Sequence, residues 1–266
     1  MPIEAFSSPR AAVPNAFSLI NSYPALTVGL TIFTLFLFII DLSTQHSLGH
    51  KFALYPGAIF EFDLNRLSFY LLFHTDFFHW LFNVIALFQP LATYERAHGT
   101  IYTGVLLNLL TVVAGLQYSI LGTFLVGNQT KIIGLSGIVF SLLAYTAYKE
   151  HFTTPVLYTL NFGSGRSVQL PTLYSPFVLL VACSILLPNG SFLGHLCGIS
   201  AGYLLGMDYL KILFPPHKVI LFIDNKCDRA IRLLDGVVIF VRESDAVSTR
   251  SVGYVPILST DLESAA

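Results

Sequence analysis

The stretch that decides the fold lies in the last third of the chain and reads Gly194-His195-Leu196-Cys197-Gly198-Ile199-Ser200-Ala201-Gly202. Its glycines recur at every fourth residue and continue to Gly206. Glycines at this spacing line one side of a helix and let a neighbouring helix approach closely, as is typical of packing inside membranes. The stretch therefore predicts a membrane-spanning helix in tight contact with another helix.

The composition of the whole chain also indicates a membrane protein. Of its 266 residues, 54% are hydrophobic and 11% are charged, and the mean hydropathy is +0.69. Water-soluble domains carry about 25% charged residues. The net charge of −1 favours neither nucleic acid nor an acidic partner. Cys183, Cys197 and Cys227 do not form a disulfide framework, and Met1 to Arg10 lack the pattern of a cleaved signal peptide.

Six apolar runs predict an all-α membrane protein with six transmembrane helices. Each span must be helical, because lipid offers no hydrogen-bond partner to an unpaired backbone group. The predicted spans are Pro24–Ile40, His74–Thr93, Ile101–Val126, Ile132–Tyr148, Leu170–Leu187 and Phe192–Phe214. They divide the chain into an N-terminal segment (1–23), a six-span core (24–214) and a C-terminal tail (215–266).

The distribution of lysine and arginine predicts the orientation. If the N-terminus is cytosolic, 11 of the 14 basic residues lie on the cytosolic side, and seven of these lie at Lys211 or after it. Only Lys51, Arg66 and Lys131 lie on the other side. Cytosolic loops are enriched in basic residues, so both termini are expected in the cytosol.

Two segments outside the spans are amphipathic. The first loop, Asp41 to Phe73, mixes charged residues with Phe, Leu and Tyr, and this predicts short helices in the membrane interface. In the tail, Val219–Ile223 and Ile231–Leu234 fit either a basic element on the membrane surface or a solvated segment with incidental apolar patches. The tail is expected to be disordered from about Glu243 and could bind a cytosolic partner.

A reactive serine is suggested where the fourth span opens. Ser136 lies between Gly134-Leu135 and Gly137, and small neighbours allow a substrate carbonyl to approach its hydroxyl. The same small residues also fit simple helix packing.

His195 is predicted to lie beside Ser136. Ser136 lies five residues below Lys131 and His195 six below Asn189, which places each roughly 7 to 9 Å into the membrane. The two spans run in the same direction, so the side chains can share the hydrogen bond that a nucleophile and its base need. In isolation, His195 also fits a buried structural histidine.

The second span adds hydrogen-bond donors at a similar depth. His79 and Asn83 are four residues apart, so their side chains point to the same side of a helix. Together they could stabilise an oxyanion. His74 lies five residues before His79, near the interface. An ordinary hydrogen-bond network between helices is the alternative for all three residues.

Taken together, these motifs resemble the rhomboid family of intramembrane serine proteases. The matching motifs are His74-x4-His79-x3-Asn83, Gly134-x-Ser136-Gly137 and Gly194-His195-x2-Gly198-x3-Gly202. They fall on the second, fourth and sixth spans, and the resemblance covers roughly residues 24 to 214. The chain is similar in particular to the fungal Golgi rhomboids, which also have a cytosolic C-terminal extension. This likeness implies a multi-pass protein of the Golgi membrane with its active site near the lumenal face.

The resemblance also implies residue roles. Ser136 would attack the scissile carbonyl, and His195 would take its proton and pass it to the leaving amine. His79, Asn83 and the Ser136 amide would hold the oxyanion, and this would be a dyad rather than a triad. The glycines, among them Gly134, Gly137, Gly198 and Gly202, would allow tight helix contacts. The implied substrates are single-span membrane proteins in the lipid bilayer, reached through a gate near the fifth span, with no metal or organic cofactor.

Two positions depart from the family pattern. Arg66 lies where many members have the arginine of a Trp-Arg pair, but Asn65 replaces the tryptophan. Phe140 stands where many members have a tyrosine against the histidine, so stacking is kept and a hydroxyl is lost.

Three other functions are weaker alternatives. A catalytically inactive relative could bind membrane helices in quality control or trafficking, but such proteins usually lack the serine or the histidine. A transporter would be expected to show inverted repeats and mid-span acidic residues. A zinc protease is excluded because the sequence has no His-Glu-x-x-His motif. An aspartyl protease is excluded because Asp208 has no partner aspartate in another span. Cys197 points about 200° away from His195 on a helix, which argues against a cysteine nucleophile.

Overall fold

The computed structural model describes residues 21–163, 165–187 and 190–246. The N-terminal stretch Met1 to Arg10 and Asn189, both used above, lie outside these ranges. The described chain is mostly helical, as predicted, and its one sheet is a two-stranded hairpin.

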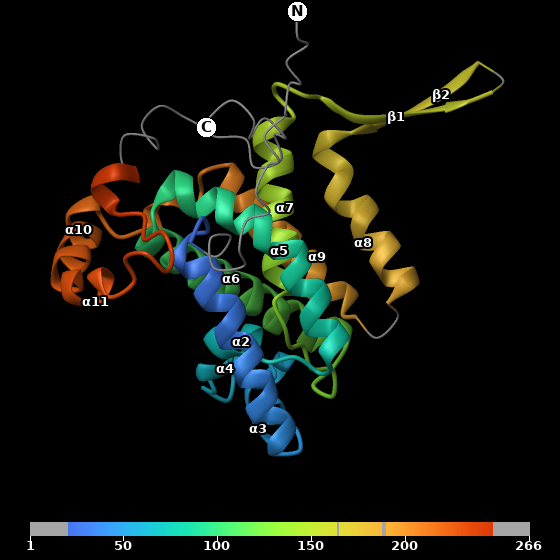
Figure 1. Cartoon of the computed structure of the whole chain (residues 1–266). Helices are drawn as coiled ribbons and strands as arrows, with labels where there is room; N and C mark the ends of the chain where they lie inside the picture. Colours follow the sequence, from blue (N-terminus) through green and yellow to red (C-terminus); the bar gives the residue numbers. More distant parts are fainter. Residues whose placement is uncertain (1–20, 164, 188–189, 247–266) are drawn as a thin grey trace, which may run out of the picture.

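Each of the six predicted spans overlaps one principal helix (Figure 1). These helices are α2 (Ala25–Ser43), α5 (Phe77–His98), α6 (Thr100–Leu125), α7 (Ser136–Glu150), α8 (Ser175–Leu186) and α9 (Phe192–Gly206). Among the described residues, α2 and α6 are long and apolar enough to cross a bilayer alone, whereas α8 and α9 are shorter apolar helices. The six-span count and the orientation therefore stay predictions.

The first loop folds into short helices, as expected. These are α3 (Ser47–Phe52), η1 (Pro56–Ile59), α4 (Asn65–Phe69) and η2 (Tyr70–Leu72). The segment from α4 to η2 is bent by 92° from α5, so it does not extend the second helix.

Several predicted boundaries are wrong. The second helix ends at His98 rather than Thr93, and the fourth begins at Ser136 rather than Ile132. The second helix begins at Phe77 rather than His74, because the Asp76 carboxylate caps it by accepting the N–H of His79 at 2.9 Å. The fifth helix begins at Ser175 rather than Leu170, because β1 (Val156–Phe162) pairs with β2 (Arg166–Pro171) and is followed by η3 (Thr172–Tyr174).

The sixth helix ends at Gly206, eight residues before the predicted Phe214. Asp208 takes a positive φ of 68°, which a continuing helix does not allow. Its carboxylate pairs with Lys149 at 3.3 Å and Lys211 at 3.0 Å, so the chain turns here. The short helix η4 (Lys211–Leu213) follows.

The predicted close approach of the glycine stripe is confirmed by the packing of α9 on α7. A Cβ at Gly198 would lie 2.5 Å from the carbonyl oxygen of Gly137, and one at Gly202 would overlap the carbonyl of Ser141. Ser141 Oγ lies 2.8 Å from the carbonyl oxygens of both Gly137 and Gly198, so its hydroxyl links the two helices. The α7 and α9 backbones are therefore in direct contact.

A buried carboxylate joins three other helices. Glu95, near the end of α5, accepts the backbone N–H groups of Leu26 and Thr27 at 2.8 Å each. It also accepts the hydroxyls of Thr27 and Thr100 at 2.8 Å. These donors belong to the first turns of α2 and α6, where backbone N–H groups lack partners within the helix. Glu95 thus satisfies two backbone N–H groups of α2 and holds the start of α6 through the Thr100 hydroxyl.

The tail is ordered further than predicted. It forms α10 (His217–Lys226) and α11 (Asp228–Arg232), and its description continues to residue 246. Glu243, where disorder was expected, is only 1% exposed. Its N–H donates to Asp224 at 2.7 Å, and its carboxylate lies 2.7 Å from His217 Nδ1. The prediction of disorder at Glu243 is therefore wrong, and residues 247–266 lie outside the described ranges.

The same tail segment binds the helix starts that Glu95 contacts. The N–H of Ile239 donates to the Tyr23 carbonyl at 3.0 Å, and Ala25 donates to Ile239 at 2.8 Å. The N–H of Thr100 donates to Val241 at 2.9 Å. Tail residues 239–241 thus lie against the starts of α2 and α6.

We expect Gly202→Ala to destabilise the protein by about 1–3 kcal/mol, because its methyl group overlaps the Ser141 carbonyl. Thermal unfolding in detergent measures the effect. The control is Gly104→Ala in α6, where the nearest atom to the new Cβ lies 4.0 Å away. An equal midpoint for both variants would contradict the packing.

Truncation after Phe214 is expected to destabilise the protein by about 2 kcal/mol or more, because the tail's hydrogen bonds to Tyr23, Ala25 and Thr100 are lost. Truncation after Ala246 keeps all of these bonds and serves as the matched control. The midpoints of thermal unfolding should fall for the first truncation only. A similar fall in both would contradict this role of residues 239–241.

Candidate active site

The loop before Ser136 is fixed by the first loop. Ile132 exchanges two backbone hydrogen bonds with Leu54, at 2.8 and 2.9 Å, and the N–H of Gly134 donates to Tyr70 at 2.9 Å. Gly134 has a φ of +107°, and a Cβ there would lie 2.8 Å from the ring of His79. Glycine is therefore required at this position by both the backbone and the neighbouring ring.

Ser136 and His195 are brought together as the depth argument predicts. Ser136 is the first residue of α7, His195 lies in the first turn of α9, and Ser136 Oγ is 3.0 Å from His195 Nε2. Ser191 caps α9 by accepting the N–H of Gly194 at 3.1 Å. When Nδ1 carries the imidazole proton, Oγ donates to Nε2, as a nucleophile donates to its base.

Phe140 stacks on His195. The ring centroids are 4.6 Å apart and the planes differ by 29°. The expected stacking is thus present without the tyrosine hydroxyl of the family pattern. One turn separates Phe140 from Ser136 on α7, so the same helix presents the hydroxyl and supports the imidazole that it contacts.

His79 and Asn83 both lie beside Gly134, two residues before Ser136. A Cβ at Gly134 would be 2.8 Å from His79 Nε2 and 3.4 Å from Asn83 Nδ2. Asn83 is 7% exposed, and its Nδ2 has no hydrogen-bond partner among the described residues. A buried donor without a partner is costly and is available to a ligand oxygen.

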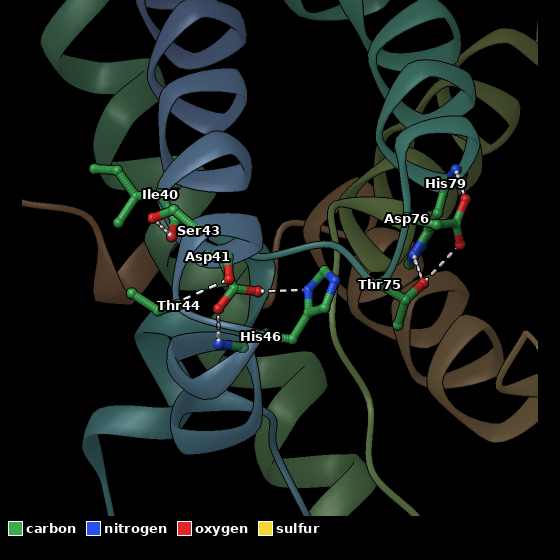
Figure 2. Close-up of polar contacts among 9 residues, drawn as sticks. Ile40, Asp41, Ser43, Thr44, His46, Thr75, Asp76 and His79 are labelled. Carbon is green, nitrogen blue, oxygen red and sulfur yellow. Dashed lines mark hydrogen bonds and ion pairs between the residues drawn. The ribbon is translucent and has the colours of Figure 1, made fainter.

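Two residues that the sequence analysis did not single out orient His79 (Figure 2). Thr75 Oγ1 lies 3.0 Å from His79 Nδ1 and donates to the Asp76 carboxylate at 2.9 Å. Asp76 also caps α5 through the N–H of His79. Binding Nδ1 in this way leaves Nε2 on the Gly134 side. The signal in the sequence was an aspartate three residues before His79, the spacing of a helix N-cap.

His74 supports the loop rather than the second helix. It is 1% exposed and accepts the N–H of Leu135 through Nε2 at 3.4 Å. Its ring also contacts that of His79 edge to face, with centroids 5.2 Å apart. His74 therefore links the residue before Ser136 to His79.

Arg66 holds the first loop together although tryptophan is absent at Asn65. Its guanidinium donates to the carbonyl of Ala53 at 2.6 Å and to Asp63 at 2.5 Å. It also lies over the ring of Tyr55, 5.0 Å from the centroid. Ala53, which Arg66 holds, is followed by Leu54, and Leu54 bonds to Ile132 in the loop before Ser136. Arg66 is therefore connected to that loop through Leu54.

The start of the first loop is fixed at the end of α2. Asp41, 1% exposed, accepts the N–H of Gly49 at 2.8 Å and lies 3.1 Å from His46 Nδ1 (Figure 2). A Cβ at Gly49 would overlap Asp41 and touch Ile133. The first loop thus contacts the segment that precedes Ser136 at several points.

The arrangement has the parts that acyl transfer requires. A hydroxyl contacts an imidazole, and donors on a second helix lie beside the residue that precedes it. The hydroxyl also lies at the N-terminus of α7, where the N–H of Ser136 itself has no acceptor within the helix.

Comparison with known proteins agrees with this geometry. The Rhomboid domain family model matches residues 61–212. "Rhomboid-type serine protease 2" of Debaryomyces hansenii is 55% identical over 256 residues, covering 96% of this chain and 88% of that protein. The proteins of the same name from Candida albicans and Saccharomyces cerevisiae are 46% and 38% identical, covering 90% and 89% of this chain and 84% and 88% of theirs. The chain therefore belongs to the rhomboid family and is an integral-membrane serine hydrolase of that family.

Proposed function

We propose that the chain cleaves single-span membrane proteins in or near the lumenal end of their spans, through a Ser136–His195 dyad. The observation that supports this most directly is the 3.0 Å contact between Ser136 Oγ and His195 Nε2. Its position at the first turns of α7 and α9 supports a reaction near one face of the membrane.

In the proposed reaction, Ser136 Oγ attacks the carbonyl carbon of the scissile bond while His195 Nε2 takes the hydroxyl proton. The tetrahedral intermediate collapses as the imidazolium gives that proton to the leaving amine. An acyl-enzyme on Ser136 remains. Water then attacks the ester with His195 as the base, which releases the carboxylate product and restores the serine.

The oxyanion would be held by three donors. These are the Ser136 N–H at the start of α7, Asn83 Nδ2, which has no partner among the described residues, and His79 Nε2. For Nε2 to carry the ring proton, Nδ1 must accept from Thr75, so the Thr75 hydroxyl would turn its proton from Asp76 to His79. Thr75 and Asp76 would act on the reaction only through the orientation of His79. Phe140 would likewise position the His195 ring by stacking, in place of the carboxylate of a triad.

We also propose where the protein acts. The resemblance to fungal Golgi rhomboids supports a Golgi membrane, and the lysine and arginine bias supports a cytosolic tail with the site near the lumen. The exposed surfaces of α10 and α11 would then face the cytosol, where a partner could bind the tail.

Purified wild-type protein is expected to be labelled by a fluorophosphonate, because His195 activates the Ser136 hydroxyl. Ser136→Ala and His195→Ala should each abolish labelling. Ser184→Ala is the matched control, since that hydroxyl bonds only within its own helix, to Leu180 at 2.7 Å.

The same experiment separates the protease from the inactive binder. A folded wild type, judged by a cooperative thermal transition, that takes up no label would favour a catalytically silent protein that binds membrane helices. Labelling retained in Ser136→Ala would place the nucleophile elsewhere and contradict the assignment.

Asn83→Ala and His79→Ala are each expected to lower kcat for a transmembrane peptide by about 10²–10³-fold, the usual effect of removing one oxyanion donor. KM should change little, because the donors act on charge that develops in the transition state. Asn108→Ala, which removes an exposed amide from α6, is the control. Unchanged kcat in folded Asn83→Ala protein would remove Asn83 from the oxyanion site.

A further inference from the structure

The hairpin between α7 and α8 has no role in the proposed chemistry. Its strands β1 and β2 are antiparallel and pair Tyr158 with Leu170, Leu160 with Val168 and Phe162 with Arg166. Figure 1 shows the hairpin projecting beyond α8, transverse to α7. A two-stranded hairpin on its own is marginally stable in water, so its exposed surface requires explanation.

The register divides the hairpin into one apolar and one polar face. Paired residues lie on the same face, and faces alternate along each strand. One face therefore carries Tyr158, Leu160, Phe162, Val168 and Leu170, with Arg166 at the tip. The opposite face carries Thr159, Asn161, Ser167 and Gln169. Leu157 lies at an irregularity in the register and stands outside this alternation.

The apolar face is uncovered by the described chain. Tyr158, Leu160, Phe162 and Val168 are 61%, 49%, 55% and 56% exposed. A continuous apolar face of this kind marks a contact surface rather than a surface in water.

Lipid is the partner that the surroundings favour. The apolar surface of α8, which begins four residues after β2, is also exposed at Val178, Val181 and Ile185. Only Pro176 and Leu180 of α8 are buried. The hairpin thus extends sideways from the end of a helix whose exposed surface is apolar.

The composition of the hairpin also fits a membrane interface. Between Glu150 and Asp208 the sequence has no acidic residue, so the segment carries no charge that anionic headgroups repel. Exposed Phe152 and Tyr174 flank the hairpin, and such aromatic residues gather at membrane interfaces. Arg166, on the apolar face at the tip, can reach headgroups while its stem stays in lipid.

We propose that the hairpin 156–171 is an interfacial anchor that lies flat on the adjacent leaflet, with its apolar face in the lipid and its polar face in water. It binds the bilayer surface itself, with anionic headgroups around Arg166. It thereby fixes the end of α8 nearest the hairpin, a helix with few buried residues. The proposal depends on membrane embedding and not on catalysis.

The test uses single cysteines in full-length protein with Cys183, Cys197 and Cys227 replaced, labelled with an environment-sensitive fluorophore in anionic lipid nanodiscs. Leu160→Cys and Val168→Cys probe the apolar face, and the adjacent Thr159→Cys and Gln169→Cys are matched controls on the polar face. We expect blue-shifted emission and quenching by nitroxide lipids at 160 and 168. Positions 159 and 169 should instead be quenched by aqueous iodide.

Equal iodide quenching at 159 and 160 would show the apolar face in water and overturn the proposal. Protection of 160 from both quenchers would show contact with protein, in this preparation a second copy, and would also overturn it. Each cysteine variant must keep the cooperative thermal transition of its background. The substituted side chains are exposed, so this condition is readily met.

Discussion

The direct contact between the backbones of α7 and α9 is the constraint on which the rest of the structure depends. Gly198 and Gly202 admit the α7 backbone where any side chain would exclude it, and Ser141 joins the two helices through its hydroxyl. Ser136 and His195 lie at the ends of this contact, at the start of each helix. The packing of two 15-residue helices, and not a loop, thus sets the 3.0 Å distance between Ser136 Oγ and His195 Nε2.

Around this pair, the remaining site residues are placed by short, local interactions. The first loop binds the segment before Ser136 through Leu54 and Tyr70, while α5 presents His79 and Asn83 to Gly134. The site residues are therefore held in place before any substrate binds. Donors fixed in this way stabilise the charge that develops in a transition state. The family and the serine hydrolase class rest on comparison, whereas the residue roles are proposed from this geometry.

Much of this could be predicted from sequence, because apolar runs and glycine spacing report directly on burial and close approach. The six principal helices and the Ser136–His195 contact follow from that signal. The helix boundaries were missed because they depend on single polar residues, such as the Asp76 cap and Asp208 with its positive φ. The hairpin was missed although its strands alternate in polarity, since the adjoining apolar residues resembled the start of a span.

The Glu95 hydrogen bonds also have a consequence for the order in which the protein can be assembled. Helix α2 is synthesised before its acceptor, because Glu95 lies 69 residues after Leu26 in the chain. The N–H of Thr100 bonds to the carbonyl of Val241, which is synthesised 141 residues later. During synthesis, the first turn of α2 therefore cannot form its hydrogen bonds to Glu95 until the end of α5 has been made. The contacts on this side of the molecule can be complete only after residues 239–241 have been synthesised.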